Sequence, residues 1–223
     1  MPVISKATLK FLKELKANNN RDWFMANKPR YETVKSEFEL FIEPLLKQIS
    51  KFDPSVSGLT PKDCIFRIYR DVRFSKDKSP YKTHIGAYIS GSGKKTEVHE
   101  KAGYYIHIEP GASMLAGGAY VPGTGWLKAI RQEIDYNQKE FLSLIRSKNF
   151  KTLFGELDGE KLSKVPKGYD ATHPLIDLLK YKSFLAVHYS PDKTVVSDAF
   201  LSHAANVFKN ISPLNGFLNR CLD

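Results

Sequence analysis

The chain reads GYYIHIEPGASMLAGGAYV over residues 103–121. Two runs of strand-forming and small apolar residues, 103–109 and 114–121, flank proline, glycine and serine residues that favour a turn. Earlier runs at 65–74 and 85–90 have the same character and are separated by similar turn residues. The spacing therefore predicts four consecutive strands that form an antiparallel meander.

Helical patterns flank this strand region on both sides. Apolar residues recur every three to four positions over 7–17 and 29–52. Pro29 suits a first helical turn, whereas Pro44 predicts a kink or a break near residues 40–44. Downstream, the helical segments are 126–134, 138–146, 174–181 and 192–208, and one further strand is expected at 184–189. This order predicts an α+β fold, an antiparallel sheet covered by helices with N-terminal and C-terminal helical segments, in a single domain over 1–223.

The composition is that of an ordinary globular protein. Of 223 residues, 42% are hydrophobic and 26% are charged, which excludes a disordered chain. No window of 18 uninterrupted apolar residues occurs, and the first residues, MPVISK, have no apolar signal core, so we expect no membrane span and a cytoplasmic location. Cys64 and Cys221 are far apart and match neither a disulfide framework nor a Cys-x-x-Cys metal motif, so we expect free thiols.

Positive charge is concentrated in one segment. The formal net charge is +10, and a field of that sign favours anionic partners. Residues 62–82 contain seven Lys or Arg side chains and three Asp side chains, so this segment supplies +4 of the total. We therefore place the candidate site in it.

The sequence RIYRDVRFSKDKSPYKTH, residues 67–84, carries this charge. If residues 65–73 are extended, alternation places Arg67, Asp71 and Arg73 on one face and Arg70 on the other. Two guanidinium groups that flank a carboxylate can bind a phosphate or carboxylate through paired hydrogen bonds. The polar, turn-like residues 75–80 would then bring the side chains that follow to the same ligand.

We predict that this segment binds an anionic small molecule. The ligand-binding candidates are Arg67, Arg70, Arg73, Asp77, Lys78 and Lys82, and the candidates for proton transfer are Asp71, Tyr81 and His84. Two alternatives remain. The same basic residues would contact phosphates in a nucleic-acid-binding module while tyrosines stack on bases, or the motif is a structural ion network. The interleaved aspartates disfavour a simple phosphate-tracking stripe, and the pattern indicates no particular cofactor, oligomeric state or enzymatic reaction.

The six histidines do not form a His-Glu-x-x-His motif. His107 and Glu109 share a face of their predicted strand, and His84 or His188 would join them from a neighbouring strand. Without paired ligand spacing, hydrogen-bonded histidines are the favoured interpretation, and we predict no metal site.

A second polar stretch, NNRDWF at residues 19–24, has two interpretations. An asparagine or aspartate would cap a short helix while Trp23 and Phe24 enter the core. Alternatively, Arg21 and Trp23 would flank a ligand pocket. The first interpretation is favoured.

A longer motif spans the basic segment: R-x-x-R-D-x-R-F at residues 67–74, followed by D-K-x-x-Y at residues 77–81. It resembles the signature of the mostly bacterial family called domain of unknown function 2461. Further similar segments are 19–24, 103–105, 117–118 and 166–174. The resemblance implies that the Arg, Asp, Lys and Tyr side chains of the motif belong together, and it implies no particular reaction.

Overall fold

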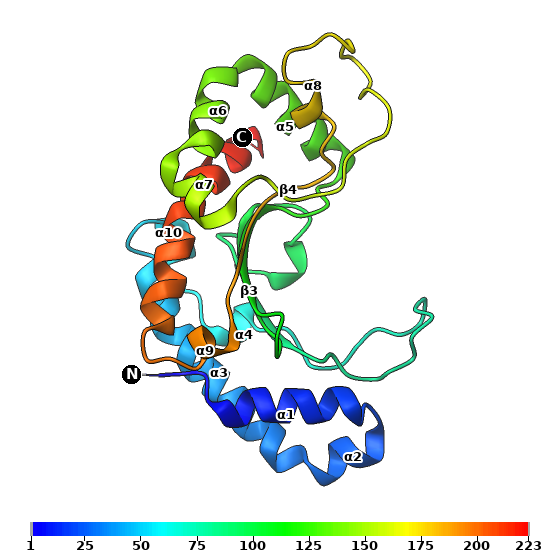
Figure 1. Ribbon diagram of the computed structural model, residues 1–223, viewed down its shortest axis with the longest axis vertical. Coiled ribbons are helices and arrows are strands. Elements are labelled where there is room, and N and C mark those ends of the chain that lie inside the picture. The colour runs from blue at the N-terminus through cyan, green and yellow to red at the C-terminus, as the bar shows by residue number, and fades with distance from the viewer. Residues whose placement is uncertain (1, 223) are drawn as a thin grey trace. The chain divides into compact units, whose positions relative to one another are not determined.

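Helices and one antiparallel sheet build the protein, which a computed structural model describes for residues 2–222 (Figure 1). The helices are α1 (Lys6–Ala17), α2 (Arg21–Ala26), α3 (Lys28–Ile49), α4 (Pro61–Cys64), α5 (Thr124–Tyr136), α6 (Gln138–Arg146), α7 (Lys148–Phe154), α8 (Ile176–Leu179), α9 (Asp192–Val195) and α10 (Phe200–Asn219). The strands are β1 (Ile85–Ile89), β2 (Gly103–Ile108), β3 (Met114–Ala119) and β4 (Phe184–Tyr189). The sheet order is β1-β2-β3-β4, a meander, and the predicted α+β class is confirmed.

The chain divides into two compact units. Unit 1 contains Met1–Lys95, Tyr105–Leu115 and Tyr189–Asn206, and unit 2 contains Thr96–Tyr104, Ala116–His188 and Val207–Asp223. Strands β2, β3 and β4 each give residues to both units. The arrangement as a single domain stays a prediction.

The first helix of unit 1 follows its sequence pattern closely. The Ser5 hydroxyl caps α1 by accepting a hydrogen bond from the Thr8 backbone N–H (3.2 Å). Phe11, Leu12 and Leu15, the residues at helical spacing, are fully buried. Their face packs on α3, which runs beside α1 in Figure 1, so burial of this apolar stripe determines where α1 lies.

Helix α3 continues through Pro44, so of the kink or break predicted near residues 40–44 the break is wrong. Proline removes the N–H that would bond the carbonyl of Leu40. The Leu40 side chain is 60% exposed, so water can reach this carbonyl. On the opposite face Phe41, Leu45 and Ile49 are buried, and burial of this apolar stripe stabilises the helix on both sides of Pro44.

The expected strand at 65–74 forms only in part. Its beginning pairs through isolated antiparallel bridges, such as that between Tyr69 and Tyr81. The chain then turns, because the Asp71 carboxylate accepts a hydrogen bond from the backbone N–H of Arg73 (3.2 Å). The alternation expected from a strand therefore ends at residue 70.

Two C-terminal helices differ from their predicted bounds. Helix α8 is shorter than the expected segment 174–181. The expected helix at 192–208 is interrupted after α9, where the Ser197 hydroxyl donates to the Thr194 carbonyl (2.7 Å), and α10 then extends past Pro213. Helix α7 has no counterpart among the expected segments. The strand β4 begins and ends where the sequence places it.

Two close approaches in unit 2 require glycine. A Cβ on Gly117 would collide with the side chain of Ile211, and a Cβ on Gly118 would collide with the backbone carbonyl of Phe184 in β4. Gly118 also has a φ of +120°, which L-residues with side chains rarely adopt. These contacts explain why glycine occupies both positions of the segment 117–118.

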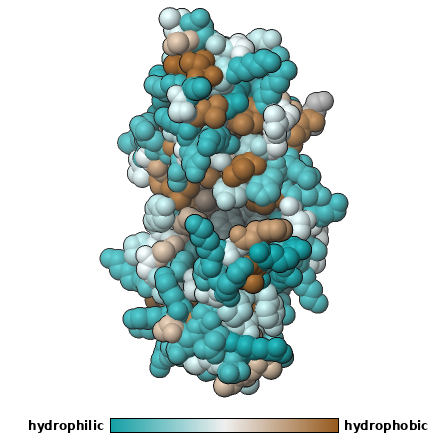
Figure 2. Space-filling view, turned by 90° about the vertical axis from the view of Figure 1, so that its right-hand side faces the viewer, coloured by the Kyte–Doolittle hydropathy of each residue, from teal (hydrophilic) through white to brown (hydrophobic). Residues whose placement is uncertain are grey.

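The molecular surface is mixed in polarity. On the face shown in Figure 2, hydrophilic side chains cover most of the area and apolar side chains form small separate groups. Among the described residues, no helix combines the length and apolar character that a membrane span requires.

Candidate anion-binding site

Tyr81 is anchored in unit 1 by the polar stretch at residues 19–24. The Asn19 side chain donates to the Tyr81 carbonyl (2.9 Å) and accepts from the Tyr81 backbone N–H (3.1 Å). The Tyr81 ring stacks on Phe24, with centroids 3.9 Å apart. Asn20 caps α2 by accepting from the backbone N–H of Trp23 (2.9 Å), and Phe24 is buried. Capping by Asn20 and burial of Phe24 are therefore as predicted, whereas Trp23 is only half-buried.

This anchoring decides what Tyr81 can do. Tyr81 is only 4% exposed, and burial raises the pKa of the Tyr81 phenol. The hydroxyl therefore stays protonated near neutral pH. It can donate a hydrogen bond to a ligand, but it is poorly suited to act as a base.

A cavity of about 390 Å³ lies beside Tyr81. Its walls are formed by Lys16, Asn19, Arg70, Asp77, Ser79, Tyr81, Lys82, Thr83 and His84. Five of the residues that the sequence singled out meet here: Arg70, Asp77, Tyr81, Lys82 and His84. Sequence reasoning missed Lys16, Asn19, Ser79 and Thr83. Only Asn19 carried a signal, because it lies in a segment that resembles the family.

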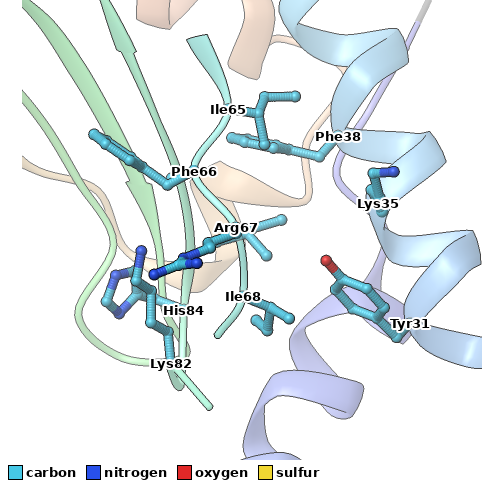
Figure 3. A pocket seen from close by; sticks show the side chains of 11 residues that line it. Tyr31, Lys35, Phe38, Ile65, Phe66, Arg67, Ile68, Lys82 and His84 are labelled. Carbon is cyan, nitrogen blue, oxygen red and sulfur yellow. The ribbon is translucent and has the colours of Figure 1, made fainter. Parts of the chain in front are cut away.

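A second, much smaller cavity is also lined by Lys82 and His84 (Figure 3). It also contains Arg67, whose side chain extends toward Lys82 and His84 in Figure 3. Arg67 lines the smaller cavity and Arg70 lines the larger one. Because both cavities share Lys82 and His84, the two arginines nevertheless approach the same pair of residues. We call Lys16, Arg67, Arg70, Lys82 and His84 the basic groove.

Lys82 has an unfavourable electrostatic environment. It is half-buried, and burial together with repulsion from Arg67 lowers the pKa of its ammonium group. Its Nζ lies 5.0 Å from the centre of the Phe66 ring, a weak cation–π contact. Within residues 2–222, neither Lys82 nor Arg67 forms an ion pair with a carboxylate. Lys82 therefore has no carboxylate within ion-pair distance, and Arg67 has only the longer-range attraction of Asp71, whose pKa Arg67 helps to lower.

The remaining ionic residues of the motif bind one another. Arg70 forms an ion pair with Asp77, and the Arg70 guanidinium also donates to the Ser79 carbonyl (3.2 Å). The pKa of Asp77 is lowered to about 2, chiefly by hydrogen bonds from Ser79 and then from Arg70. Asp77 is thus ionised throughout the physiological pH range, and it partly neutralises the groove at Arg70.

Three predicted site residues lie outside both cavities. Asp71 and Arg73 form an exposed pair with two short contacts, Nη2–Oδ2 at 2.7 Å and Nε–Oδ1 at 3.0 Å. Hydrogen bonding to Arg73 lowers the pKa of Asp71 to about 2, so Asp71 is a weak base. The Lys78 Nζ donates to the Val72 carbonyl (2.9 Å). For these three side chains, the structure favours the ion-network alternative.

His84 also belongs to a cluster with His107 and Glu109, which lie on and directly after β2. The His107 Nε2 lies 3.1 Å from the Glu109 Oε2, and the rings of His84 and His107 are 4.1 Å apart. Burial, followed by the influence of His107, lowers the pKa of His84 to about 4, so its ring is neutral at pH 7. His188, the other histidine that the sequence offered for this cluster, instead contacts the Leu153 carbonyl through Nδ1 (2.9 Å).

The fold and the groove define an α+β protein with a basic, partly enclosed surface cavity. The chain belongs to the DUF2461 family of conserved hypothetical proteins, whose match covers residues 7–217. No curated protein and no solved structure matches the chain.

Proposed function

We propose that the basic groove binds a small molecule bearing a phosphate or carboxylate group. The observation that carries the proposal is the pair of adjacent cations, Arg67 and half-buried Lys82, neither of which forms an ion pair with a carboxylate of the described chain. Like charges held together at a partly desolvated site raise the free energy of the native state. A bound anion would remove this repulsion.

The side chains of the groove have complementary roles. Arg67 offers a planar guanidinium that can donate two parallel hydrogen bonds to one anionic group, and Lys82 supplies a compact positive charge. His84, being neutral, adds one donor or acceptor without charge. Lys16 and Arg70 extend the positive surface toward the rest of a larger ligand.

Lys82→Met provides the test, with inorganic phosphate as the probe. We expect phosphate to raise the Tm of the wild type and to bind Lys82→Met at least about tenfold more weakly, since a charge-assisted hydrogen bond is worth about 1.5–3 kcal/mol. Without phosphate, the Tm of Lys82→Met should be unchanged or higher, because methionine keeps the apolar stem and removes the repulsion from Arg67. Differential scanning fluorimetry and calorimetric titration measure both effects.

The matched control is Lys76→Met, which removes an exposed lysine of the same motif. It should leave phosphate affinity within about twofold of the wild-type value, a change smaller than about 0.5 kcal/mol. Equal losses in Lys76→Met and Lys82→Met would show general charge attraction and contradict a site at the groove. Unchanged affinity in both Lys82→Met and Arg67→Met would also contradict it.

A second candidate function, nucleic-acid binding, has one specific observation in its favour. Phe74 is 96% exposed, and the Arg73 guanidinium lies over its ring at 5.9 Å from the ring centre. An exposed aromatic ring among basic residues can stack on an unpaired base. Stabilisation by a short single-stranded oligonucleotide that fades steeply with salt, without stabilisation by phosphate, would favour this function over the first.

A further inference from the structure

We propose that His84, His107 and Glu109 form a binding site for a divalent transition-metal ion such as Zn²⁺. Each of the three residues offers one ligand atom, and these atoms lie within 4.8 Å of one another. Ligand atoms about 2.0–2.2 Å from a tetrahedral ion lie about 3.3–3.6 Å from one another, so the widest pair would close by about 1 Å on binding. The cluster therefore needs only small side-chain movements to close around an ion.

The residues around the cluster are those expected to support metal ligands. The Tyr105 hydroxyl lies 3.0 Å from the His107 Nδ1. A tyrosine hydroxyl can accept a hydrogen bond from Nδ1–H, which leaves the lone pair of Nε2 free for a metal ion. The Thr83 hydroxyl donates to the Glu109 Oε1 (3.1 Å), which orients the carboxylate while its Oε2 faces His107.

The donor set selects the class of ion. Two imidazole nitrogens and one carboxylate oxygen suit Zn²⁺, Fe²⁺ or Co²⁺, whereas Mg²⁺ and Ca²⁺ favour all-oxygen sites. His107 is only 8% exposed, so an ion there would be well shielded. His84 lines both cavities of the groove. A metal ion bound to His84 would therefore face the groove with the coordination positions that the protein does not fill.

The alternative is a hydrogen-bonded network in which a proton on the His107 Nε2 is donated to Glu109. The two arrangements respond differently to Lys16, whose Nζ lies 3.2 Å from the Glu109 Oε1. In a metal site Lys16 competes with the ion for the carboxylate. Removal of this lysine should therefore strengthen metal binding.

The experiment is a calorimetric titration of tag-free, EDTA-dialysed protein with ZnCl₂ in phosphate-free buffer. We expect one Zn²⁺ per chain. His84→Ala should weaken Zn²⁺ binding at least about tenfold, and His107→Ala about a hundredfold. Loss of a residue that only supports a ligand already costs about 10–100-fold in metal affinity, so loss of a ligand should cost at least as much. Lys16→Met should bind more tightly than wild type. The matched control, His99→Ala, removes an exposed histidine of unit 2 and should leave affinity unchanged.

Two further measurements separate the outcomes. Glu109→Gln retains the size of the side chain and should weaken Zn²⁺ binding while its metal-free circular dichroism matches wild type, which excludes misfolding as the cause. The proposal is overturned if Zn²⁺, Co²⁺ and Mn²⁺ all fail to bind wild type saturably, or if His99→Ala loses as much affinity as His107→Ala. The proposed anion site does not decide this result, because phosphate binding is measured separately on metal-free protein.

Discussion

Gly118→Ala is expected to lower the free energy of unfolding by about 2–6 kcal/mol, because two costs combine. The φ of +120° at this position strains any residue with a Cβ, at about 1–3 kcal/mol. The new methyl group would also overlap the carbonyl of Phe184, and overpacking adds about 1–3 kcal/mol. The clash is with backbone of β4, so it cannot be relieved by rotation of a side chain. Urea unfolding followed by circular dichroism measures the loss.

Gly216→Ala is the matched control for this substitution. Gly216 lies inside α10 and does not have a positive φ, and no atom outside its own helix lies within 4 Å of the place that a methyl group would take. Alanine is favoured over glycine in a helix interior by about 0.5–1 kcal/mol, so stability should rise slightly. If Gly118→Ala proved as stable as wild type, the close approach of β3 and β4 would be incorrect.

Phe24→Ala is expected to cost about 3–5 kcal/mol, the range for removing a buried aromatic ring. Phe24 is 1% exposed and contacts the rings of Tyr31, Tyr69 and Tyr81. Truncation leaves a cavity directly under the Tyr81 ring. Lys82 follows Tyr81 in the chain, so phosphate affinity should fall along with stability, although Phe24 does not line the groove. Urea unfolding and the phosphate titration report the two losses.

Phe74→Ala makes the same chemical change at a side chain that is 96% exposed. We expect it to alter stability by less than about 0.5 kcal/mol, because no packing is lost. Phe24→Leu keeps much of the buried volume and should recover part of both losses. A large stability loss in Phe74→Ala, or none in Phe24→Ala, would show that the packing around Tyr81 has been assigned wrongly.

The parts of the fold that the sequence predicts well are those where local pattern and burial agree. Helix α1 and strand β4 have a strict apolar period and clear ends, so they form within one residue of their expected limits. The predicted break at Pro44 does not occur because burial of the apolar stripe of α3 outweighs the low helix propensity of proline. The prediction for segment 65–74 is too long because the Asp71 side chain accepts a hydrogen bond from the Arg73 backbone N–H, which ends the strand pattern.

The candidate site is predictable only in part for a related reason. Charge density marks the segment that lines most of the groove. Alternation cannot show that Arg73 and Lys78 bind within their own loop, to Asp71 and to the Val72 carbonyl. Nor can it place Lys16 beside the groove, since that contact depends on how α1 packs in unit 1. Residues that come from distant elements need the tertiary structure.

The ion pair between Arg70 and Asp77 gives the groove an anion of its own. At the proposed anion site, a ligand that contacts Arg70 would have to displace a carboxylate that is tethered seven residues away, and a tethered group competes at a high effective concentration. A dianion that also contacts Arg67 and Lys82 would compete better than a monovalent anion. We therefore expect Asp77 to act as a selectivity filter of the proposed site, one that disfavours monovalent anions most strongly.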